Sequence, residues 1–324
     1  MRKHLYANLW LLGSTLALCC VAYVVALWVL GQVFFPRTAA GSLLAGPGGR
    51  PVGSGLIAQP FSGDEHFHPR PSAVAYNASA SGGSNWGASQ YLLRDRVARQ
   101  LGPIARYRTA PAQGRSVQRD LEQWFEATPD VVATWADRYP GSARAWVNAD
   151  DRHKAAVVDW KAQHPAALSE WKASHPGAGD PEPADLAVPF FRGNSASFHR
   201  SWPRLIEDPS WGVTAVFFEM WLQDHEGVDL EPVPADLVTT SGSGLDPHIT
   251  LEGARYQRER VADAWSRKTN IEKAVVLREI ENLLVEKARA PLYGWAGVPL
   301  INVLEVNLSI ADRLNGPVRP ATRR

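Results

Sequence analysis

The stretch LWLLGSTLALCCVAYVVALWVLGQVFF, residues 9–35, decides the architecture of this chain. No Asp, Glu, Lys or Arg occurs between Lys3 and Arg37. A hydrocarbon core about 30 Å thick needs about 20 helical residues at ~1.5 Å each, so the run is long enough to cross it. Trp10 and Trp28 lie near its two ends, where aromatic rings favour the membrane interface. The stretch predicts a membrane-spanning helix at 9–35 that precedes one long extramembrane portion.

A cleaved signal peptide is the alternative. Its apolar region spans about 7–15 residues and ends at small residues, whereas this run is longer and Thr38-Ala39-Ala40 is a poor cleavage site. A retained anchor is therefore favoured. Arg2 and Lys3 precede the helix, so the positive-inside bias puts the N-terminus in the cytoplasm and the main domain in the periplasm or outside the cell.

Charge and cysteine content narrow the class. The formal net charge is +1, so neither nucleic acid nor an anionic membrane surface is implied as a partner. The only cysteines, Cys19 and Cys20, lie in the apolar run. The portion after it is therefore expected to fold without disulfides.

The segment after the apolar run begins rich in Gly and Pro. Residues 55–61 (GLIAQPF) predict a short strand, and residues 61–88 read as turns. Ser89 is a candidate N-cap for a helix that carries apolar residues every four positions and ends before Gly102-Pro103.

A tryptophan repeat marks the middle of the chain, residues 103–231. The recurring tryptophans are spaced eleven residues apart in two runs, and most are followed five residues later by proline: Trp124, Trp135, Trp146, Trp160 and Trp171, with Pro129, Pro140, Pro165 and Pro176. Eleven residues are close to three α-helical turns, and proline is tolerated at the first helical position. The pattern predicts short helical units, each started by a proline and each burying one Trp. An aromatic ligand-binding face is the alternative, and residues 187–222 read as a satellite core.

The early character returns after residue 232. A turn-rich segment at 234–250 precedes a helix to about Trp265. A second helix is predicted from Thr269, where Thr-Asn-Ile-Glu272 fits a capping box, with Val276, Ile280, Leu283 and Leu284 facing inward. The alternation of Leu304, Val306, Leu308 and Ile310 with polar residues predicts a half-buried strand.

Signatures of enzymes are missing from the sequence. It contains no Gly-Lys dipeptide, His-Glu-x-x-His, Cys-x-x-Cys, Gly-x-Ser-x-Gly or Asp-Lys-Thr-Gly-Thr. The stretch Asp64-Glu65-His66-Phe67-His68 could offer metal ligands, but Pro69 and Pro71 next to it favour a solvated turn. His164 and His175 each precede a repeat proline and fit capping or packing better. The Ser/Gly stretches 81–85 and 241–244 could present backbone N–H groups to an anion, but neither has a companion lysine. No metal site and no catalytic residue is predicted.

Several long motifs nevertheless carry a resemblance. They are GSGLIAQPF (53–61), FHPRPSA (67–73), YNASASGGSN (76–85), VPADLVTTSGSGLDPHIT (233–250), Gln257 with RVA (260–262), and GVPLINVLEVNL (297–308). In this order behind one membrane helix, they resemble the C subunit family of the Kdp high-affinity potassium-transporting ATPases. The motif residues are Arg70, Pro71, Ser72, Ser81, Gly82, Gly83, Ser84, Asn85, Ser241, Gly244, Leu245, Asp246, Ile249, Arg260, Asn302 and Asn307.

The resemblance covers residues 1–102 and 232–313 and implies a fold and a function. It implies a non-catalytic subunit in a bacterial inner-membrane complex with a channel-like potassium-translocating subunit and a P-type ATPase subunit. The family's C subunit is described as a catalytic chaperone that raises the ATP affinity of the ATPase subunit, and Gln257 occupies the place of a glutamine proposed to contact nucleotide. The predicted topology opposes such contact, so any effect on ATP would be indirect, and no tightly bound cofactor is expected.

The predicted organisation is therefore a mixed α/β (α+β) outer domain, residues 36–102 with 232–313, behind a single-pass helix. A mainly α-helical insertion occupies 103–231, and a disordered tail occupies 314–324. Within the membrane helix, Gly13 with Ala17 and Ala22 with Ala26 are small-xxx-small pairs that favour close helix packing. The alternative function is a membrane-anchored module that binds the cell envelope through the Trp-rich insertion.

Overall fold

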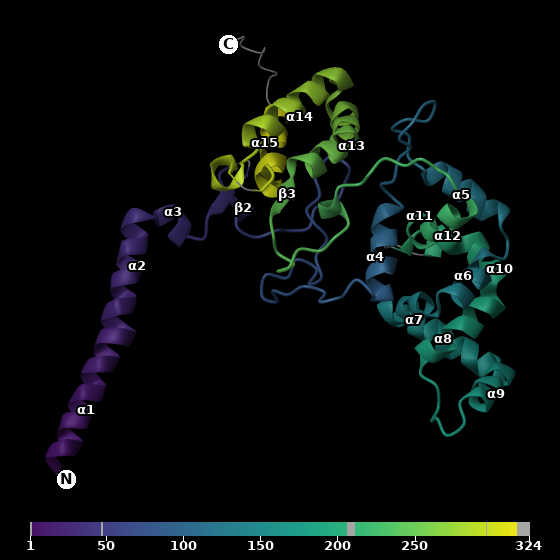
Figure 1. The fold of residues 1–324 in the computed structure, drawn as a ribbon, viewed down its shortest axis with the longest axis horizontal. Coiled ribbons are helices and arrows are strands. Elements are labelled where there is room, and N and C mark those ends of the chain that lie inside the picture. The colour runs from purple at the N-terminus through teal and green to yellow at the C-terminus, as the bar shows by residue number, and fades with distance from the viewer. Residues whose placement is uncertain (1, 47, 206–210, 296, 316–324) are drawn as a thin grey trace. The chain divides into compact units, whose positions relative to one another are not determined.

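The computed structural model describes residues 2–46, 48–205, 211–295 and 297–315 and is mostly helical with few strands (Figure 1). It divides into two compact units. The first unit comprises Met1–Gly83 and Thr240–Arg324, and the second comprises Ser84–Thr239. The predicted tail lies outside the described residues from 316 onward.

The chain begins with one long apolar helix. α1 (Arg2–Leu16) runs through a π-helical turn, Ala17–Ala22, into α2 (Tyr23–Phe34). Over Lys3–Phe34 it is long and apolar enough to cross a membrane, and its apolar window is entirely unburied. The structure confirms a helix of membrane-spanning length and composition over the predicted stretch, and its insertion in a membrane stays a prediction. A short helix α3 (Pro36–Ala39) follows.

A small hairpin connects this helix to the rest of the first unit. β1 (Leu43–Ala45) pairs antiparallel with β2 (Pro51–Ser54). The strand predicted at 55–61 is wrong, because the ladder ends at Ser54 and the chain then turns. The Leu56 N–H donates to Ser54 Oγ at 3.1 Å, and the Ala58 N–H donates to the carbonyl of Leu245 at 2.9 Å.

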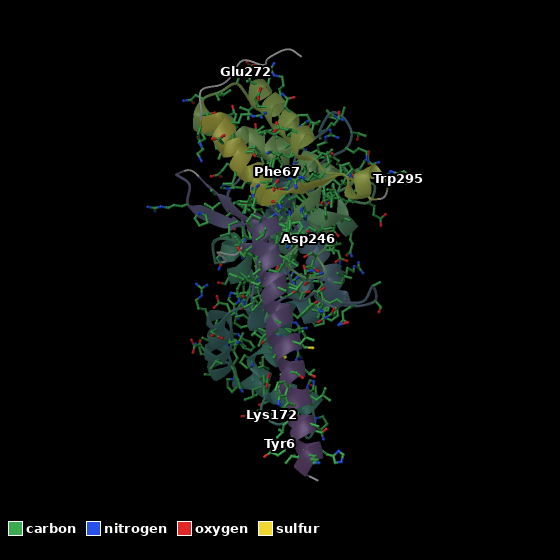
Figure 2. The ribbon with its side chains drawn as sticks, turned by 90° about the vertical axis from the view of Figure 1, so that its left-hand side faces the viewer. Tyr6, Phe67, Lys172, Asp246, Glu272 and Trp295 are labelled. Atoms are coloured by element: carbon green, nitrogen blue, oxygen red, sulfur yellow. The ribbon has the colours of Figure 1, made fainter. Side chains whose placement is uncertain are left out.

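Helices α13 (Leu251–Thr269), α14 (Lys273–Lys287) and α15 (Val303–Asn315) build the core of the first unit. β3 (His248–Thr250) pairs antiparallel with β4 (Leu300–Asn302), and the short 3₁₀ helix η5 (Pro291–Gly294) lies between α14 and β4. Thr250 caps α13 by accepting from the Gly253 N–H at 2.8 Å. The Phe67 ring is fully buried among these helices, whereas Trp295 is 92% exposed (Figure 2).

The strand predicted over 304–310 is instead helix α15. Its buried positions Val303, Val306, Asn307, Ile310 and Leu314 follow the helical spacing. Asn302, the last residue of β4, starts the helix because its Oδ1 accepts from the Glu305 N–H at 3.1 Å. The apolar residues at 304–310 fit both a strand and a helix. The Asn302 cap and the pairing of β3 with β4, which ends at Asn302, favour the helix.

The helix boundaries around residue 270 also differ from prediction. α13 continues to Thr269, and Asn270 follows with φ of +56°, the left-handed conformation typical of a helix end. Thr269 Oγ1 donates to the carbonyl of Trp265 at 2.7 Å, so it does not form the predicted capping box, and α14 starts at Lys273. The four apolar residues predicted to face inward from α14 are all buried.

The regular elements among the described residues of the second unit are helices, with isolated bridges in place of strands. Its helices are α4 (Tyr91–Leu101), α5 (Gln118–Ala127), α6 (Val131–Arg138), α7 (Pro140–Ala149), α8 (Asp151–Gln163), α9 (Pro165–Ser174), α10 (Ala187–Leu205), α11 (Val213–Val216) and α12 (Phe218–Asp224), with 3₁₀ turns η2 (Pro183–Leu186) and η4 (Ala235–Leu237). Gln90, and not the predicted Ser89, occupies the N-cap position of α4, and its side chain makes no capping hydrogen bond. At its other end a Cβ on Gly102 would lie 1.8 Å from the carbonyl of Thr214, so α4 and α11 meet closely there.

The proline rule of the repeat holds only in part. Prolines start α7 and α9, but α6 begins two residues after Pro129, and Asp150 starts α8 by accepting from the Arg152 N–H at 2.8 Å. Trp135, Trp146 and Trp160 are buried, and Trp124 and Trp171 are partly buried against the same core. Trp135, Trp146 and Trp160 therefore belong to the interior of the unit, as the predicted packing role requires.

A recurring helix end follows two tryptophans of the repeat, Trp160 and Trp171, and also Trp221. His164, His175 and His225 each terminate a helix four residues after a Trp, with the imidazole Nδ1 bonded to that Trp carbonyl at 2.8, 3.0 and 2.8 Å. Each imidazole also stacks on the same indole, with ring centroids 4.5, 4.3 and 5.0 Å apart. The unit Trp-x-x-x-His therefore ends a helix and satisfies one of its unpaired carbonyls.

Residues 187–222 are not a satellite core. Trp202 packs edge-on against Trp135 at 5.5 Å between centroids, and Phe191 packs against Trp146 at 5.0 Å. α10 therefore shares one hydrophobic core with α6 and α7.

Candidate functional site

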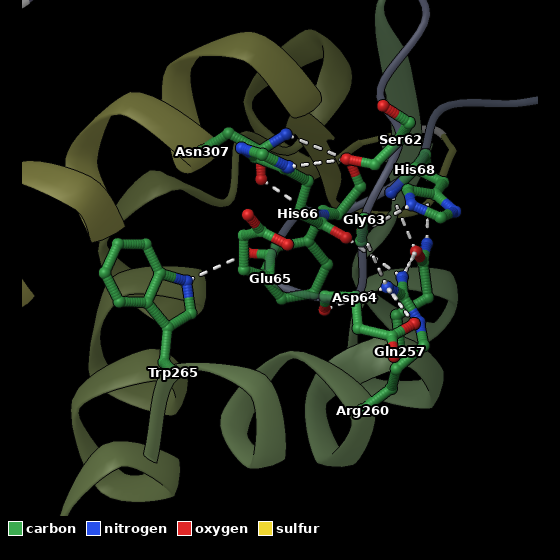
Figure 3. A network of polar contacts seen from close by, with 11 residues as sticks. Ser62, Gly63, Asp64, Glu65, His66, His68, Gln257, Arg260, Trp265 and Asn307 are labelled. Atoms are coloured by element: carbon green, nitrogen blue, oxygen red, sulfur yellow. Dashed lines mark hydrogen bonds and ion pairs between the residues drawn. The ribbon is translucent and has the colours of Figure 1, made fainter. Parts of the chain in front are cut away.

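The segment Ser62–His68 lies against α13 and α15, and buried side chains bind its backbone (Figure 3). Gln257, on α13, is only 6% exposed. Its Oε1 accepts from the His68 N–H at 2.8 Å, and its Nε2 donates to the His68 carbonyl at 3.1 Å. Arg260 Nη2 donates to the same Oε1 at 2.9 Å. Both ends of the Gln257 amide are therefore engaged within the chain.

Asn307, on α15, repeats this arrangement one residue earlier. Its Oδ1 accepts from the Phe67 N–H at 2.8 Å, and its Nδ2 donates to the Phe67 carbonyl at 2.9 Å. Two side-chain amides thus pair with two consecutive residues in the way that a neighbouring strand would. The buried Phe67 ring fixes the segment from its apolar side.

Arg260 and Trp265 bind the preceding residues of the segment. The Arg260 guanidinium donates to the carbonyls of Asp64 and His66, each at 2.9 Å. Trp265 Nε1 donates to the Glu65 carbonyl at 2.8 Å. We call Gln257, Arg260, Trp265 and Asn307, together with residues 62–68, the amide clasp.

The two histidines of the clasp bond to backbone. His66 Nδ1 lies 2.9 Å from the Ser62 carbonyl, and His68 Nε2 lies 3.0 Å from the Gly63 carbonyl. Burial, together with the charge of Arg260, lowers the pKa of His68. Among the described residues no group of three or more His, Cys, Asp or Glu side chains is placed to hold a metal ion.

A second polar network joins residues 70–76 to residues 240–246. Arg70 Nη2 donates to the Thr240 carbonyl at 3.1 Å, and Ser72 Oγ donates to the Gly244 carbonyl at 2.7 Å. The Tyr76 hydroxyl donates to the Arg70 carbonyl at 2.9 Å, and burial raises the pKa of Tyr76 to about 12. A hydrogen bond from His248 lowers the pKa of Asp246, whose carboxylate also lies 3.9 Å from Arg70.

The two Ser/Gly stretches lie side by side. The Gly82 N–H donates to the Ser243 carbonyl at 2.9 Å, and Ser81 Oγ donates to the same carbonyl at 3.3 Å. A Cβ on Gly83 would lie 2.9 Å from the carbonyl of Gly242, and one on Gly244 would lie 2.8 Å from that of Gly82. The glycines therefore allow close backbone approach, and these groups bind one another in place of the anion considered above.

The remaining motif residues are spread over the structure. Asn302 donates through Nδ2 to the Gly55 carbonyl at 2.8 Å, and Ile249 lies in the core. Ser241 is buried, while Ser84 and Asn85 belong to the second unit. Pro71 follows Arg70 in the second network, and Leu245 accepts from the Ala58 N–H. The contacts of Trp265 and Arg260 with the backbone of residues 64–66 could not be predicted from the sequence, because only the fold brings the 62–68 segment against α13.

These features define a class of protein. One N-terminal helix of membrane-spanning length carries a mainly helical chain, and the polar motif residues of the first unit mostly bind their own backbone. The chain belongs to the family "K+-transporting ATPase, c chain" (KdpC), whose model matches residues 5–136 and 216–312. The expected resemblance is confirmed.

Known relatives match nearly the whole chain. The potassium-transporting ATPase KdpC subunit of Methylibium petroleiphilum is 30% identical over 97% of this chain and 99% of its own length. The KdpC subunits of Parvibaculum lavamentivorans and Rhodospirillum rubrum are 26% and 28% identical over 95% and 97% of this chain. These alignments include the Trp-rich region, whereas the family model leaves residues 137–215 unmatched.

Proposed function

We propose that the chain is a non-catalytic accessory subunit that stabilises the assembly of the ATP-driven potassium import complex. Its partners are the channel-like potassium-translocating subunit and the P-type ATPase subunit. The observation that carries this proposal is the family match over both halves of the chain, which meet in the first unit through the amide clasp and the Arg70 network. A unit held together in this way presents a fixed surface to its partners.

The proposed topology places the N-terminus in the cytoplasm and the rest of the chain on the periplasmic side of the bacterial inner membrane. Arg2 and Lys3 before the helix support it, because basic residues next to a membrane helix favour the cytoplasmic side. Under this topology the folded units and the cytoplasmic ATP site lie on opposite sides of the membrane.

We further propose that the subunit raises ATP affinity indirectly and binds no cofactor tightly itself. A subunit that binds one conformation of its partner better than another shifts the population toward that conformation. The hydrogen bonds of Gln257 to His68 and Arg260 support a structural role for this glutamine in place of direct contact with nucleotide.

Co-purification tests the assembly role. An epitope-tagged chain, expressed together with the other subunits, is expected to bring the channel-like and ATPase subunits through purification in mild detergent. A complex prepared without the chain is expected to be less stable and to show a higher KM for ATP. Purification of the tagged chain alone would contradict the proposal.

Photo-crosslinking with an azido-ATP analogue separates the indirect effect from direct contact. We expect label on the ATPase subunit and none on this chain. Labelling of this chain that unlabelled ATP competes away would overturn the indirect mechanism while leaving the assembly role standing.

A further inference from the structure

The hairpin that follows the membrane helix comprises the described residues 42–46 and 48–58, and hydrogen bonds join its two arms. We call it the exit hairpin. Leu43 pairs with Ser54 and Leu44 with Gly53. Ser54 Oγ donates to the Gly41 carbonyl at 2.7 Å, and the Gly55 N–H donates to the Ser42 carbonyl at 3.0 Å. The chain therefore leaves the membrane helix through a shaped structure and not through a loose linker.

Apolar side chains of this hairpin are exposed. Leu43, Val52 and Leu56 are 52%, 42% and 59% exposed, and Ile57 is 37% exposed. The register shifts after the Leu44–Gly53 pair, so that Ala45 pairs with Pro51 and Val52 bulges out of the ladder. Adjoining exposed apolar side chains of this kind mark an interaction surface.

The charges around the hairpin have one sign. Between Phe35 and Gly63 the only ionisable side chains are those of Arg37 and Arg50, both exposed, and no Asp or Glu occurs. This segment is therefore positively charged although the net charge of the whole chain is only +1. Basic residues close to a membrane surface are attracted to anionic lipid headgroups.

The distance to the membrane is short. Eight residues separate Phe34 from Leu43, and even a fully extended chain gains at most about 3.6 Å per residue. Part of this linker is the helix α3, which is more compact. The exit hairpin therefore stays near the surface where the apolar helix leaves the bilayer.

The hairpin is also fixed to the rest of the first unit. Asn302 Nδ2 donates to the Gly55 carbonyl, and the Ala58 N–H donates to the Leu245 carbonyl. A Cβ on Gly53 would lie 2.9 Å from Leu304 Cδ2, so the strand packs directly on α15. The hairpin and the helical core of the first unit are therefore joined by direct contacts.

We propose that the exit hairpin is a membrane-interface element that binds the lipid headgroup layer. Leu43, Val52, Leu56 and Ile57 enter the boundary between headgroups and acyl chains, and Arg37 and Arg50 bind lipid phosphates. Apolar side chains flanked by basic residues bind an interface in this manner. Through Asn302 and Leu245 the hairpin sets the orientation of the first unit on the bilayer.

Depth-dependent quenching tests this proposal on the full chain. Cys19→Ser and Cys20→Ser remove the native thiols, and Val52→Cys or Leu56→Cys then carries an environment-sensitive fluorophore. The protein is placed as one chain per nanodisc of phosphatidylcholine and phosphatidylglycerol containing a lipid-borne nitroxide. The matched control is Val285→Cys on α14, whose side chain is 58% exposed.

We expect blue-shifted emission and several-fold stronger lipid quenching at positions 52 and 56 than at 285. Equal, water-like signals at all three positions would overturn the proposal. So would quenching that disappears when the partner subunits are added, because the face would then be a protein interface. Circular dichroism of each labelled chain checks that its helices are intact.

The role of the arginines has its own outcome. In the Leu56→Cys chain, adding Arg50→Glu, or omitting phosphatidylglycerol, is expected to weaken the quenching at position 56. Unchanged quenching under both conditions would overturn the arginine–phosphate contact.

Discussion

Gln257 and Asn307 each pair with both backbone groups of a residue far away in the sequence, so their removal leaves buried donors and acceptors unsatisfied. Gln257→Ala is expected to lower the free energy of unfolding of the first unit by about 1–3 kcal/mol, since an unpaired buried polar group loses its solvation without compensation. Urea unfolding of the detergent-solubilised chain measures this change.

The matched control for Gln257 is Gln118→Ala, where the amide bonds only to Glu122 on the surface. It is expected to change stability by less than about 0.5 kcal/mol. If Gln257→Ala left stability unchanged but raised the KM for ATP of the complex, a role in nucleotide contact would be favoured over the clasp.

His68 gives the clasp a pH dependence. Because the pKa of His68 is lowered in the folded chain, the unfolded chain binds the proton more readily, and stability rises with pH where only the unfolded chain is protonated. The contribution is complete above the ordinary value of 6.5 and is lost as pH falls below it toward the folded pKa. Arg260, His66 and Asp64 are the charged or titratable groups that act on it.

Unfolding of wild type and His68→Gln between pH 7.5 and pH 5 checks this prediction. The variant is expected to show a flatter dependence on pH than the wild type over the window below 6.5. Parallel curves would mean that His68 is not the group responsible.

At this scale the sequence predicted which residues belong to the motifs and not what they do. Gln257, Arg260 and Asn307 were all identified through the resemblance, yet their partners lie about 190–240 residues away in the chain. Pairings of that kind depend on how α13 and α15 pack, and no local pattern encodes them. The Gly82–Ser243 contact is hidden for the same reason.

Helix geometry relates the two predicted small-xxx-small pairs of the apolar helix to each other. In an uninterrupted α-helix the row that starts at Gly13 and Ala17 continues to Val21 and Val25. The π turn Ala17–Ala22, with its bond from the Tyr23 N–H to the Leu18 carbonyl, adds one residue to the turn. The row then continues to Ala22 and Ala26, and the two small-xxx-small pairs lie along one line.

Substitutions in this row test helix packing within the complex. Gly13→Leu with Ala17→Leu, and separately Ala22→Leu, are expected to reduce co-purification of the partner subunits without preventing membrane insertion, because a bulky side chain holds a neighbouring helix away. Val21→Leu is the matched control and is expected to leave assembly intact. Equal effects at positions 21 and 22 would remove the π turn from the explanation.

The Trp-x-x-x-His helix ends predict a graded stability effect. His164→Ala removes the hydrogen bond to the Trp160 carbonyl at the end of α8 and the stacking contact on the buried Trp160 ring. It is therefore expected to lower the free energy of unfolding by about 1 kcal/mol or slightly more. His175→Ala, next to the less buried Trp171, is the control and is expected to cost less. Tryptophan fluorescence during urea unfolding measures both, and a larger loss at His175 would contradict this account.

Elements whose apolar residues fit only the helical spacing were predicted well. Elements whose apolar pattern fits both a helix and a strand were not. The inward positions of α14 are those that the helical spacing gives. α15 was read as a strand because Leu304, Val306 and Ile310 alternate, and the cap from Asn302 that selects the helix depends on β4 pairing with β3. The end of α13 was predicted too early because the sequence does not show that Asn270 adopts the left-handed conformation that ends the helix.

The division of the whole molecule differs from the one expected. Residues 91–101 were placed in the family-like half because they precede Gly102-Pro103, but α4 packs on α7, α11 and α12. The structure therefore divides the chain at Gly83 and Thr239. Gly83 and Gly242, on either side of the second unit, lie against each other within the first unit.

The contact between Gly83 and Gly242 predicts that the second unit can be removed without unfolding the first. Replacing residues 84–239 by a Gly/Ser linker of about 2–5 residues spans two backbones that are already in contact, so the first unit is expected to keep its fold and its clasp. The chain should still co-purify with its partners and support growth at low potassium. The alternative excision of 103–231 leaves α4 without the core that covers Leu101, and it is expected to give an aggregation-prone chain. If the 84–239 excision also abolished assembly while circular dichroism showed an intact first unit, the second unit would be a docking element and not a dispensable addition.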